Sequence, residues 1–176
     1  MGLFNRKAPR GELVPAVAKA LELAKGERVL AFAVDDFTGA YVVATTYALA
    51  VVTSTAELTV RRRWLSVDAG SWEPETATLT VTWADGRRAG QWSFRDQQSL
   101  LPETLRERVQ ASVVLSTRLT LGDRRAGRVA IRQDFATREL VCQTILGRHA
   151  RADDPEVQAH VQAALAHLKD QVGLPG

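Results

Sequence analysis

Residues 27–94 read ERVLAFAVDDFTGAYVVATTYALAVVTSTAELTVRRRWLSVDAGSWEPETATLTVTWADGRRAGQWSF, and this stretch decides the fold. It consists of short runs of β-branched and aromatic residues separated by turn residues. In residues 76–83 apolar side chains alternate with threonines, which is the period-two pattern of a half-buried strand. A helix-forming segment, residues 101–115, follows directly. The sequence therefore predicts an antiparallel β-structure closed by a helix, in the α+β class.

The expected strands in this stretch are residues 28–34, 41–46, 48–53, 57–65, 76–83 and 91–95. A helix over residues 12–26 is expected to precede them, because apolar residues recur at helical spacing and Gly26 follows as a stop signal. Asp85 and Gly86 indicate a hairpin whose second strand begins at Gln91, and Trp83 and Trp92 are expected to face each other across it. The segment around Trp72, residues 70–74, is expected to be a loop.

The remainder of the chain predicts a smaller motif of three strands, residues 118–121, 128–133 and 139–146, and a final helix. That helix begins at Pro155, with Asp153 or Asp154 as its N-cap. Its buried stripe is Val157, Val161, Leu165, Leu168 and Val172. Three strands and one helix make a marginal core alone. We therefore expect residues 116–176 to pack as an extension on a barrel of residues 27–115, with residues 1–11 as a flexible tail.

The composition favours a soluble protein. The chain has 176 residues, 24% of them charged, and a formal net charge of only +3. Cys142 is the single cysteine, so an intramolecular disulfide or a multi-cysteine zinc site is excluded, and a reducing, cytoplasmic location is expected. The longest apolar run, residues 40–52, is too short to span a bilayer.

Four segments together resemble the pleckstrin-homology-like family in its bacterial and GRAM-type versions. They are YVVATTYAL (residues 41–49), WLSVD (64–68), the hairpin at residues 79–86 and the helix at residues 102–113. The resemblance covers about residues 27–115 and implies a barrel closed by a helix. Members that bind phosphoinositides have Lys and Arg around the first hairpin loop. Here that loop is DDFTG (residues 35–39), and its two carboxylates would repel a phosphate headgroup.

The densest basic cluster is Arg61, Arg62 and Arg63, next to Trp64. Guanidinium groups grip phosphates and an indole stacks on bases, so this cluster could hold phosphates or single-stranded nucleic acid. Alternatively, Arg61 and Arg63 protect an exposed strand edge, and Arg62 points to the other face, where it needs a carboxylate. The phosphate interpretation requires residues 61–63, 87–88 and 124–125 to meet on one face.

No catalytic, metal or cofactor site is expected from the remaining residues. His160 and His167 lie about 10 Å apart along the last helix, too far to share a metal ion, and His149 is expected on the surface. Cys142 lies in an apolar strand, where core packing is the usual role. The carboxylate pairs, residues 35–36 and 153–154, lie in turns and are expected to stabilise those turns.

Trp72 either anchors a partner or folds back over the barrel. We take Arg61, Arg63 and Trp72 as candidate partner-binding residues of a non-enzymatic, cytoplasmic interaction module. Its partner is an unknown protein, and homo-oligomers are also allowed. A first alternative is an FMN-binding split-barrel oxidoreductase. A second is association with anionic membranes or nucleic acid through the arginines, which predicts strong salt dependence.

Overall fold

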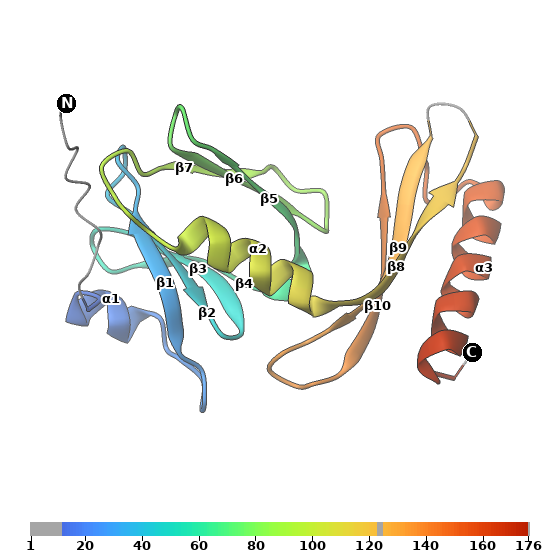
Figure 1. Ribbon diagram of the computed structural model, residues 1–176, viewed down its shortest axis with the longest axis horizontal. Coiled ribbons are helices and arrows are strands. Elements are labelled where there is room, and N and C mark those ends of the chain that lie inside the picture. Colours follow the sequence, from blue (N-terminus) through green and yellow to red (C-terminus); the bar gives the residue numbers. More distant parts are fainter. Residues whose placement is uncertain (1–11, 123–124, 176) are drawn as a thin grey trace, which may run out of the picture. The chain divides into compact units, whose positions relative to one another are not determined.

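The computed structural model describes residues 12–122 and 125–175, and the predicted tail, residues 1–11, lies outside this range. The chain forms two compact units that divide between Gln110 and Ala111, here called the N-terminal and C-terminal units. The N-terminal unit contains two antiparallel sheets, and the C-terminal unit contains one sheet and a long helix (Figure 1). The predicted α+β class is confirmed. Within the described residues, the strand pairing closes none of these sheets into a barrel.

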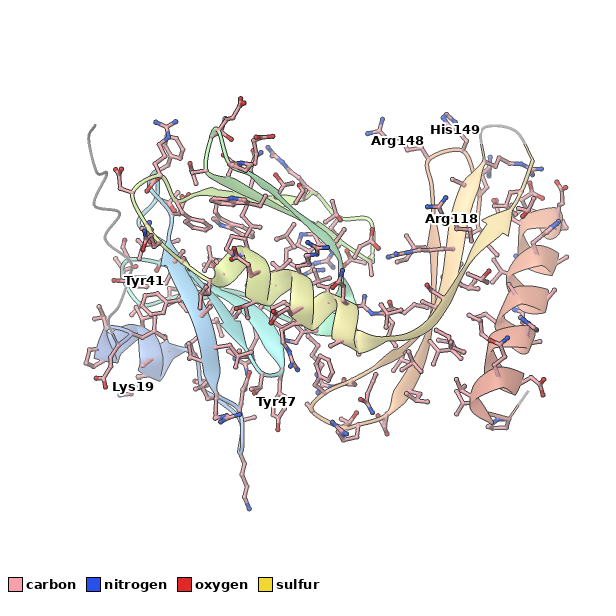
Figure 2. The ribbon with its side chains drawn as sticks, viewed as in Figure 1. Lys19, Tyr41, Tyr47, Arg118, Arg148 and His149 are labelled. Atoms are coloured by element: carbon pink, nitrogen blue, oxygen red, sulfur yellow. The ribbon has the colours of Figure 1, made fainter. Side chains whose placement is uncertain are left out.

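Sheet A is a meander of four strands: β1 (Val29–Val34), β2 (Tyr41–Thr45), β3 (Ala48–Val52) and β4 (Leu58–Arg63). Strand β3 is buried along its whole length. On one face of the sheet, α1 (Pro15–Ala20) places Val17 against Val43 and Ala50, and Tyr41 lies on the same side (Figure 2). A strand that is buried on both faces reads as a continuous apolar run. This explains the apolar character of residues 40–52.

Helix α1 is shorter than the helix predicted over residues 12–26. It ends at Ala20, Leu21 is its C-cap, and Glu22 has a positive φ of 46°. The carbonyl of Leu21 accepts a hydrogen bond from Arg61 on β4, at 2.8 Å. The backbone N–H of Ala24 donates to the Glu27 carboxylate at 2.9 Å. These bonds, one from a distant strand and one from a carboxylate three residues away, satisfy backbone groups that would otherwise continue the helix, so the helix ends early.

Sheet B follows a 3₁₀ turn, η1 (Trp64–Ser66), and contains β5 (Val67–Glu73), β6 (Thr78–Trp83) and β7 (Gly90–Ser93). The prediction of a loop around Trp72 is wrong, because Trp72 lies in β5 and pairs with Leu79. Glycine and aspartate are poor strand formers. Pairing with the strongly alternating β6 overrides this local preference at Asp68 and Gly70.

The predicted hairpin between β6 and β7 is confirmed, but the predicted pairing of Trp83 with Trp92 across it is wrong. Gly86 does turn the chain, with φ 72° and its N–H bonded to the Trp83 carbonyl at 3.1 Å, but β7 begins only at Gly90. As a result, Trp92 pairs with Leu79 instead of Trp83. The indole of Trp92 lies over Gly90, at a position that a Cβ atom would fill. The missing side chain of Gly90 thus makes room for this arrangement.

Helix α2 (Leu101–Ser112) covers the inner face of sheet B. Its buried Leu105 contacts Gly70 on β5, and Arg108 donates to the Thr46 carbonyl at 3.0 Å. The helix was predicted to continue to residue 115, but β8 (Val113–Thr120) begins directly after Ser112. Residues 113–115 are Val-Val-Leu, and β-branched residues favour a strand where a partner strand is present.

The C-terminal unit consists of β8, β9 (Ala126–Gln133), β10 (Leu140–Leu146) and α3 (Pro155–Val172). Its strands form sheet C in the order β10-β9-β8, and α3 packs on β8 and β9 (Figure 1). Asp154 is the N-cap of α3 and accepts from the Glu156 N–H at 2.9 Å, which confirms one of the two predicted caps. The predicted stripe of the last helix is confirmed, because all its members pack in one core: Val157, Val161, Leu165, Leu168 and Val172.

Candidate functional site

Arg61 is exposed, and a buried carboxylate binds its guanidinium group. Its Nη2 lies 2.5 Å from Oε2 of Glu27, whose side chain is fully buried, and its Nη1 donates to the Leu21 carbonyl. Glu27 also accepts from the Thr45 hydroxyl and the Ala24 N–H. Burial alone would raise the pKa of Glu27, but these hydrogen bonds and the Arg61 charge together lower it. Arg61 therefore connects β4 to the end of α1.

Arg62 has the carboxylate partner that sequence analysis required. Its Nη1 lies 2.9 Å from Oδ2 of Asp85, and its guanidinium covers the Trp83 ring at 4.6 Å from the centroid. Arg87 contacts the same Asp85 oxygen at 3.3 Å. The structure thus brings two of the three arginine groups together around one aspartate. The Arg62 guanidinium therefore covers one face of the Trp83 ring through a cation–π contact.

The third arginine group lies in the C-terminal unit. Arg125 contacts Asp154 at 3.4 Å and Glu156 at 2.8 Å, and Arg124 lies outside the described residues. Arg63, the other candidate arginine, is exposed at the end of β4. The phosphate interpretation of the three groups stays a prediction.

Trp72 is 38% exposed, and its ring stacks on Phe94 with a centroid distance of 6.3 Å and an interplanar angle of 12°. Phe94 is buried, so Trp72 is fixed on one side and open on the other. Trp72 pairs with Leu79, which lies four residues before Trp83 on β6. Four residues of strand span about 13 Å. The structure therefore separates Trp72 from the arginines around Asp85.

The outer edge of β5, which ends near Trp72, is open. Residues 69–73 are all exposed, and no strand among the described residues pairs with β5 on the side away from β6. The strand contains no Lys, Arg or Pro, and its charged residues, Asp68 and Glu73, lie near its two ends. A row of unpaired backbone groups of this kind is a template for another strand.

The other edges of the N-terminal unit are protected. The Gln97 side chain donates to the Val34 carbonyl at 2.5 Å and accepts from the Val34 N–H at 2.8 Å, which blocks the edge of β1. The Ser99 hydroxyl donates to the Phe32 carbonyl at 2.7 Å. Strand β4 carries Arg61–Arg63 on consecutive positions, and β7 has only four residues. Among the described edge strands of this unit, β5 is the longest, and it has no charge along its middle.

The carboxylate pair at residues 35–36 has the turn-stabilising role predicted for it. Asp35 accepts from the N–H and the hydroxyl of Thr38, and its other oxygen accepts from the Ser93 N–H at 2.8 Å. Asp36 accepts from the Arg95 N–H at 2.7 Å. The two aspartates thus join the β1–β2 turn to the end of β7.

Sequence analysis missed two surface features. Phe37 is 76% exposed at the tip of the β1–β2 turn, and the guanidinium of Arg95 lies 5.8 Å from its ring centroid. It was missed because it lies among turn residues. The open edge of β5 was missed because residues 70–74 contain glycine, serine and proline, which are typical of a loop.

The histidines and the cysteine all belong to the C-terminal unit. His160 donates to the Glu156 carbonyl and His167 contacts Gln171, while His149 is exposed next to Arg148 (Figure 2). Cys142 is half-buried and packs against the core of the C-terminal unit, which confirms its predicted role. Within residues 12–122 and 125–175, no group of three or more His, Cys, Asp or Glu could hold a metal ion. In the same residues no helix combines the length and hydropathy needed to cross a membrane.

Comparison with known proteins gives no match, whether to a protein-family model, to a curated protein or to a solved structure.

Proposed function

We propose that this chain is a non-enzymatic interaction module whose N-terminal unit binds an extended segment of a partner protein along β5. The observation that carries the proposal is the open edge of β5, which is exposed over residues 69–73. An extended segment gains backbone hydrogen bonds when it joins such an edge, and its alternate side chains supply specificity.

Trp72 provides the anchor in this mode of binding. It lies on the same face of sheet B as Leu79, so a strand added to β5 would place every second side chain on the face of the indole, and the one opposite Trp72 next to it. Stacking on Phe94 fixes the indole before binding, which lowers the entropy lost on association. Glu73 and Glu75 are exposed just beyond Trp72 and favour a basic residue at the matching end of the partner segment.

We place this module in the pleckstrin-homology-like family and in the cytoplasm. The element order of the N-terminal unit supports the family assignment, because a four-stranded meander is followed by a three-stranded meander and then by a helix. Asp35 and Asp36 occupy the first hairpin loop, which argues for a protein partner over a phosphoinositide.

The test is a selection of binding peptides from a random linear library against the purified full chain. The variant Ser71→Lys places a charge on the edge of β5, and Gln91→Lys places one on the opposite edge of the same sheet. Ser71 and Gln91 are both exposed and both pair with Thr80, so the two variants are matched. We expect Ser71→Lys to raise the dissociation constant of the selected peptides about tenfold or more. Gln91→Lys should leave that constant unchanged.

A second variant, Trp72→Ala, separates anchoring from edge pairing. Peptides should bind Trp72→Ala more weakly than wild type. In the complex that still forms, the peptide should protect only the β5 amides from hydrogen exchange, because it still pairs along that edge.

Selected peptides that bind Ser71→Lys as well as wild type would contradict the proposal. A flavin absorbance band in the purified protein would favour the FMN-binding alternative. Retention on anionic vesicles that is lost in moderate salt and on Arg87→Ala with Arg88→Ala would favour the membrane alternative.

A further inference from the structure

Strand β10 is a second open edge, and it lies in the C-terminal unit. It is the outermost strand of sheet C, and no strand that the structure describes pairs with its outer side. Its sequence, LVCQTIL over Leu140–Leu146, contains no charged residue, no proline and no glycine. Soluble proteins usually block such an edge with charge, proline or a covering element.

Helix α3 leaves β10 largely uncovered. The fully buried residues of sheet C, such as Val129 and Ile131, lie on β9 beneath the helix. On the same face of β10, Cys142 and Leu146 are only half-buried and Thr144 is exposed. Apolar side chains at the border of this core thus continue onto β10, where they are less buried than on β9.

The sequence of β10 is complementary to itself when two copies run antiparallel about Gln143. In that register Leu140 faces Leu146 of the second copy, Val141 faces Ile145, and Cys142 faces Thr144. Each pair joins side chains of similar size and polarity, and opposed β-branched and apolar residues stabilise a sheet. A shift of two residues would place Leu140 and Val141 opposite Arg148 and Gly147, outside the strand.

Charge also favours β10 for a second copy. Self-pairing of β4 would place Arg61–Arg63 beside their own copies, and like charges directly opposite each other destabilise a sheet. The outer strand at the other side of sheet C, β8, carries the exposed Arg118. Strand β10 contains no charged residue, so its self-pairing places no like charges opposite each other.

We propose that two copies of this chain associate through β10, antiparallel about Gln143, and join two three-stranded sheets into one continuous sheet of six strands. The α3 helices of both copies then lie on the same face of that sheet, because a two-fold axis perpendicular to a sheet preserves its faces. This dimer depends only on the C-terminal unit and is independent of the β5 edge.

Disulfide trapping tests the register. Directly opposed residues have Cα atoms about 4.5–5.5 Å apart, within the range that a disulfide bridges. In Thr144→Cys, each new thiol faces Cys142 of the second copy, and diamide oxidises each pair by taking two electrons and two protons. We expect a covalent dimer with two symmetric disulfides. Thr120→Cys is the control, because it adds one exposed thiol to β8 in the same sheet and should stay uncrosslinked.

Sedimentation equilibrium tests the association itself. Thr144→Lys adds a charge to the β10 edge at an exposed position, and Thr120→Lys is its match on β8. We expect wild type and Thr120→Lys to be dimers. The dimer dissociation constant of Thr144→Lys should be at least about tenfold higher. A monomeric wild type at all concentrations would overturn the proposal. So would equal crosslinking of the two cysteine variants, or a dimer that Thr144→Lys leaves intact.

Discussion

The outermost strands of sheet A and strand β10 of sheet C differ in how they are protected against pairing with another strand. The edge of β1 is closed by the side chains of Gln97 and Ser99, and β4 is lined by three arginines. Strand β10 contains no charged residue, and no strand that the structure describes pairs with its outer side. Soluble sheets that leave an edge bare are prone to pair with another strand. The bare edges, β5 and β10, are therefore where we place a partner and a second copy.

Sheet A contains a buried polar network, whereas the α3 face of sheet C has an apolar core. Glu27 is a buried carboxylate that connects α1, β2 and β4 through hydrogen bonds and one ion pair. The core between α3 and sheet C is made of aliphatic side chains. The N-terminal unit should thus be sensitive to loss of one carboxylate, and the C-terminal unit to loss of apolar volume. All four tryptophans lie in the N-terminal unit, so their fluorescence reports its unfolding separately.

The largest effect is expected from Glu27→Ala. The substitution removes three hydrogen bonds to a buried carboxylate, from the Arg61 guanidinium, the Thr45 hydroxyl and the Ala24 N–H. Hydrogen bonds to a charged group contribute about 1.5–3 kcal/mol each when buried, and the one from the exposed Arg61 contributes less, so the expected loss is about 4 kcal/mol. Urea unfolding followed by tryptophan fluorescence measures the loss. Glu57→Ala, at an exposed position in the turn before β4, is the control and should leave the transition unchanged. Equal losses for the two variants would show that the buried network does not support sheet A.

Leu168→Ala should produce the matching effect in the C-terminal unit. Leu168 is 3% exposed and packs in the core between α3 and sheet C, where truncation leaves a cavity that costs about 3 kcal/mol. Far-ultraviolet circular dichroism, to which α3 contributes half of the described α-helical residues, should show the loss, while the fluorescence transition stays in place. Gln162→Ala on the exposed side of α3 is the control. A fluorescence transition that moves as far as the dichroism transition would contradict independent unfolding of the units.

Gly70→Ala should destabilise the N-terminal unit by about 2 kcal/mol, because a Cβ atom at this position collides with Cδ2 of Leu105. Ser71→Ala, the exposed neighbour on β5, should have little effect. Combining Gly70→Ala with Leu105→Ala should cost less than the sum of the two single variants, since the second substitution removes the collision. Additive losses would mean that α2 does not press on β5 at Gly70.

Arg62→Ala should have a small effect, about 0.5–1 kcal/mol, from loss of its cation–π contact with Trp83. Its ion pair with Asp85 is partly exposed and contributes little. Arg88→Ala, an exposed position in the β6–β7 connection, is the control. A loss as large as that of Glu27→Ala would show that the arginines of β4 stabilise the fold and do more than protect its edge.

The sequence predicts those elements whose signals are local. The alternation in β6, the Asp154 cap and the apolar stripe of α3 all lie within one segment, and the structure has them where expected. The errors occur where a distant residue decides the local conformation. Arg61 ends α1 from 40 residues away, and β6 turns the presumed loop around Trp72 into a strand. Local periodicity carries no information about either contact.

The candidate site shows the same limit. The strand that became β10 was predicted almost to the residue, yet its place at the edge of a sheet depends on strand order, which no local pattern records. Trp72 was singled out for a supposed loop position, and the structure keeps it half-exposed for a different reason, its place on an edge strand. The carboxylate required by Arg62 was predicted, but its identity as Asp85 follows only from tertiary structure.

The smallest expected effect is a loss of the stability of sheet A as the pH is lowered within the accessible range. The folded-state pKa of Glu27 lies below its ordinary value of 4.5, because hydrogen bonds from Thr45 and Ala24 and the charge of Arg61 outweigh burial. Its ionised form therefore stabilises the fold fully above pH 4.5, and this stabilisation is lost as the pH falls through the folded-state pKa. The stability difference between wild type and Glu27→Gln, measured by fluorescence, should be constant near neutrality and shrink on acidification. A difference that grows as the pH falls would mean that folding raises the pKa of Glu27, and that Arg61 fails to outweigh its burial.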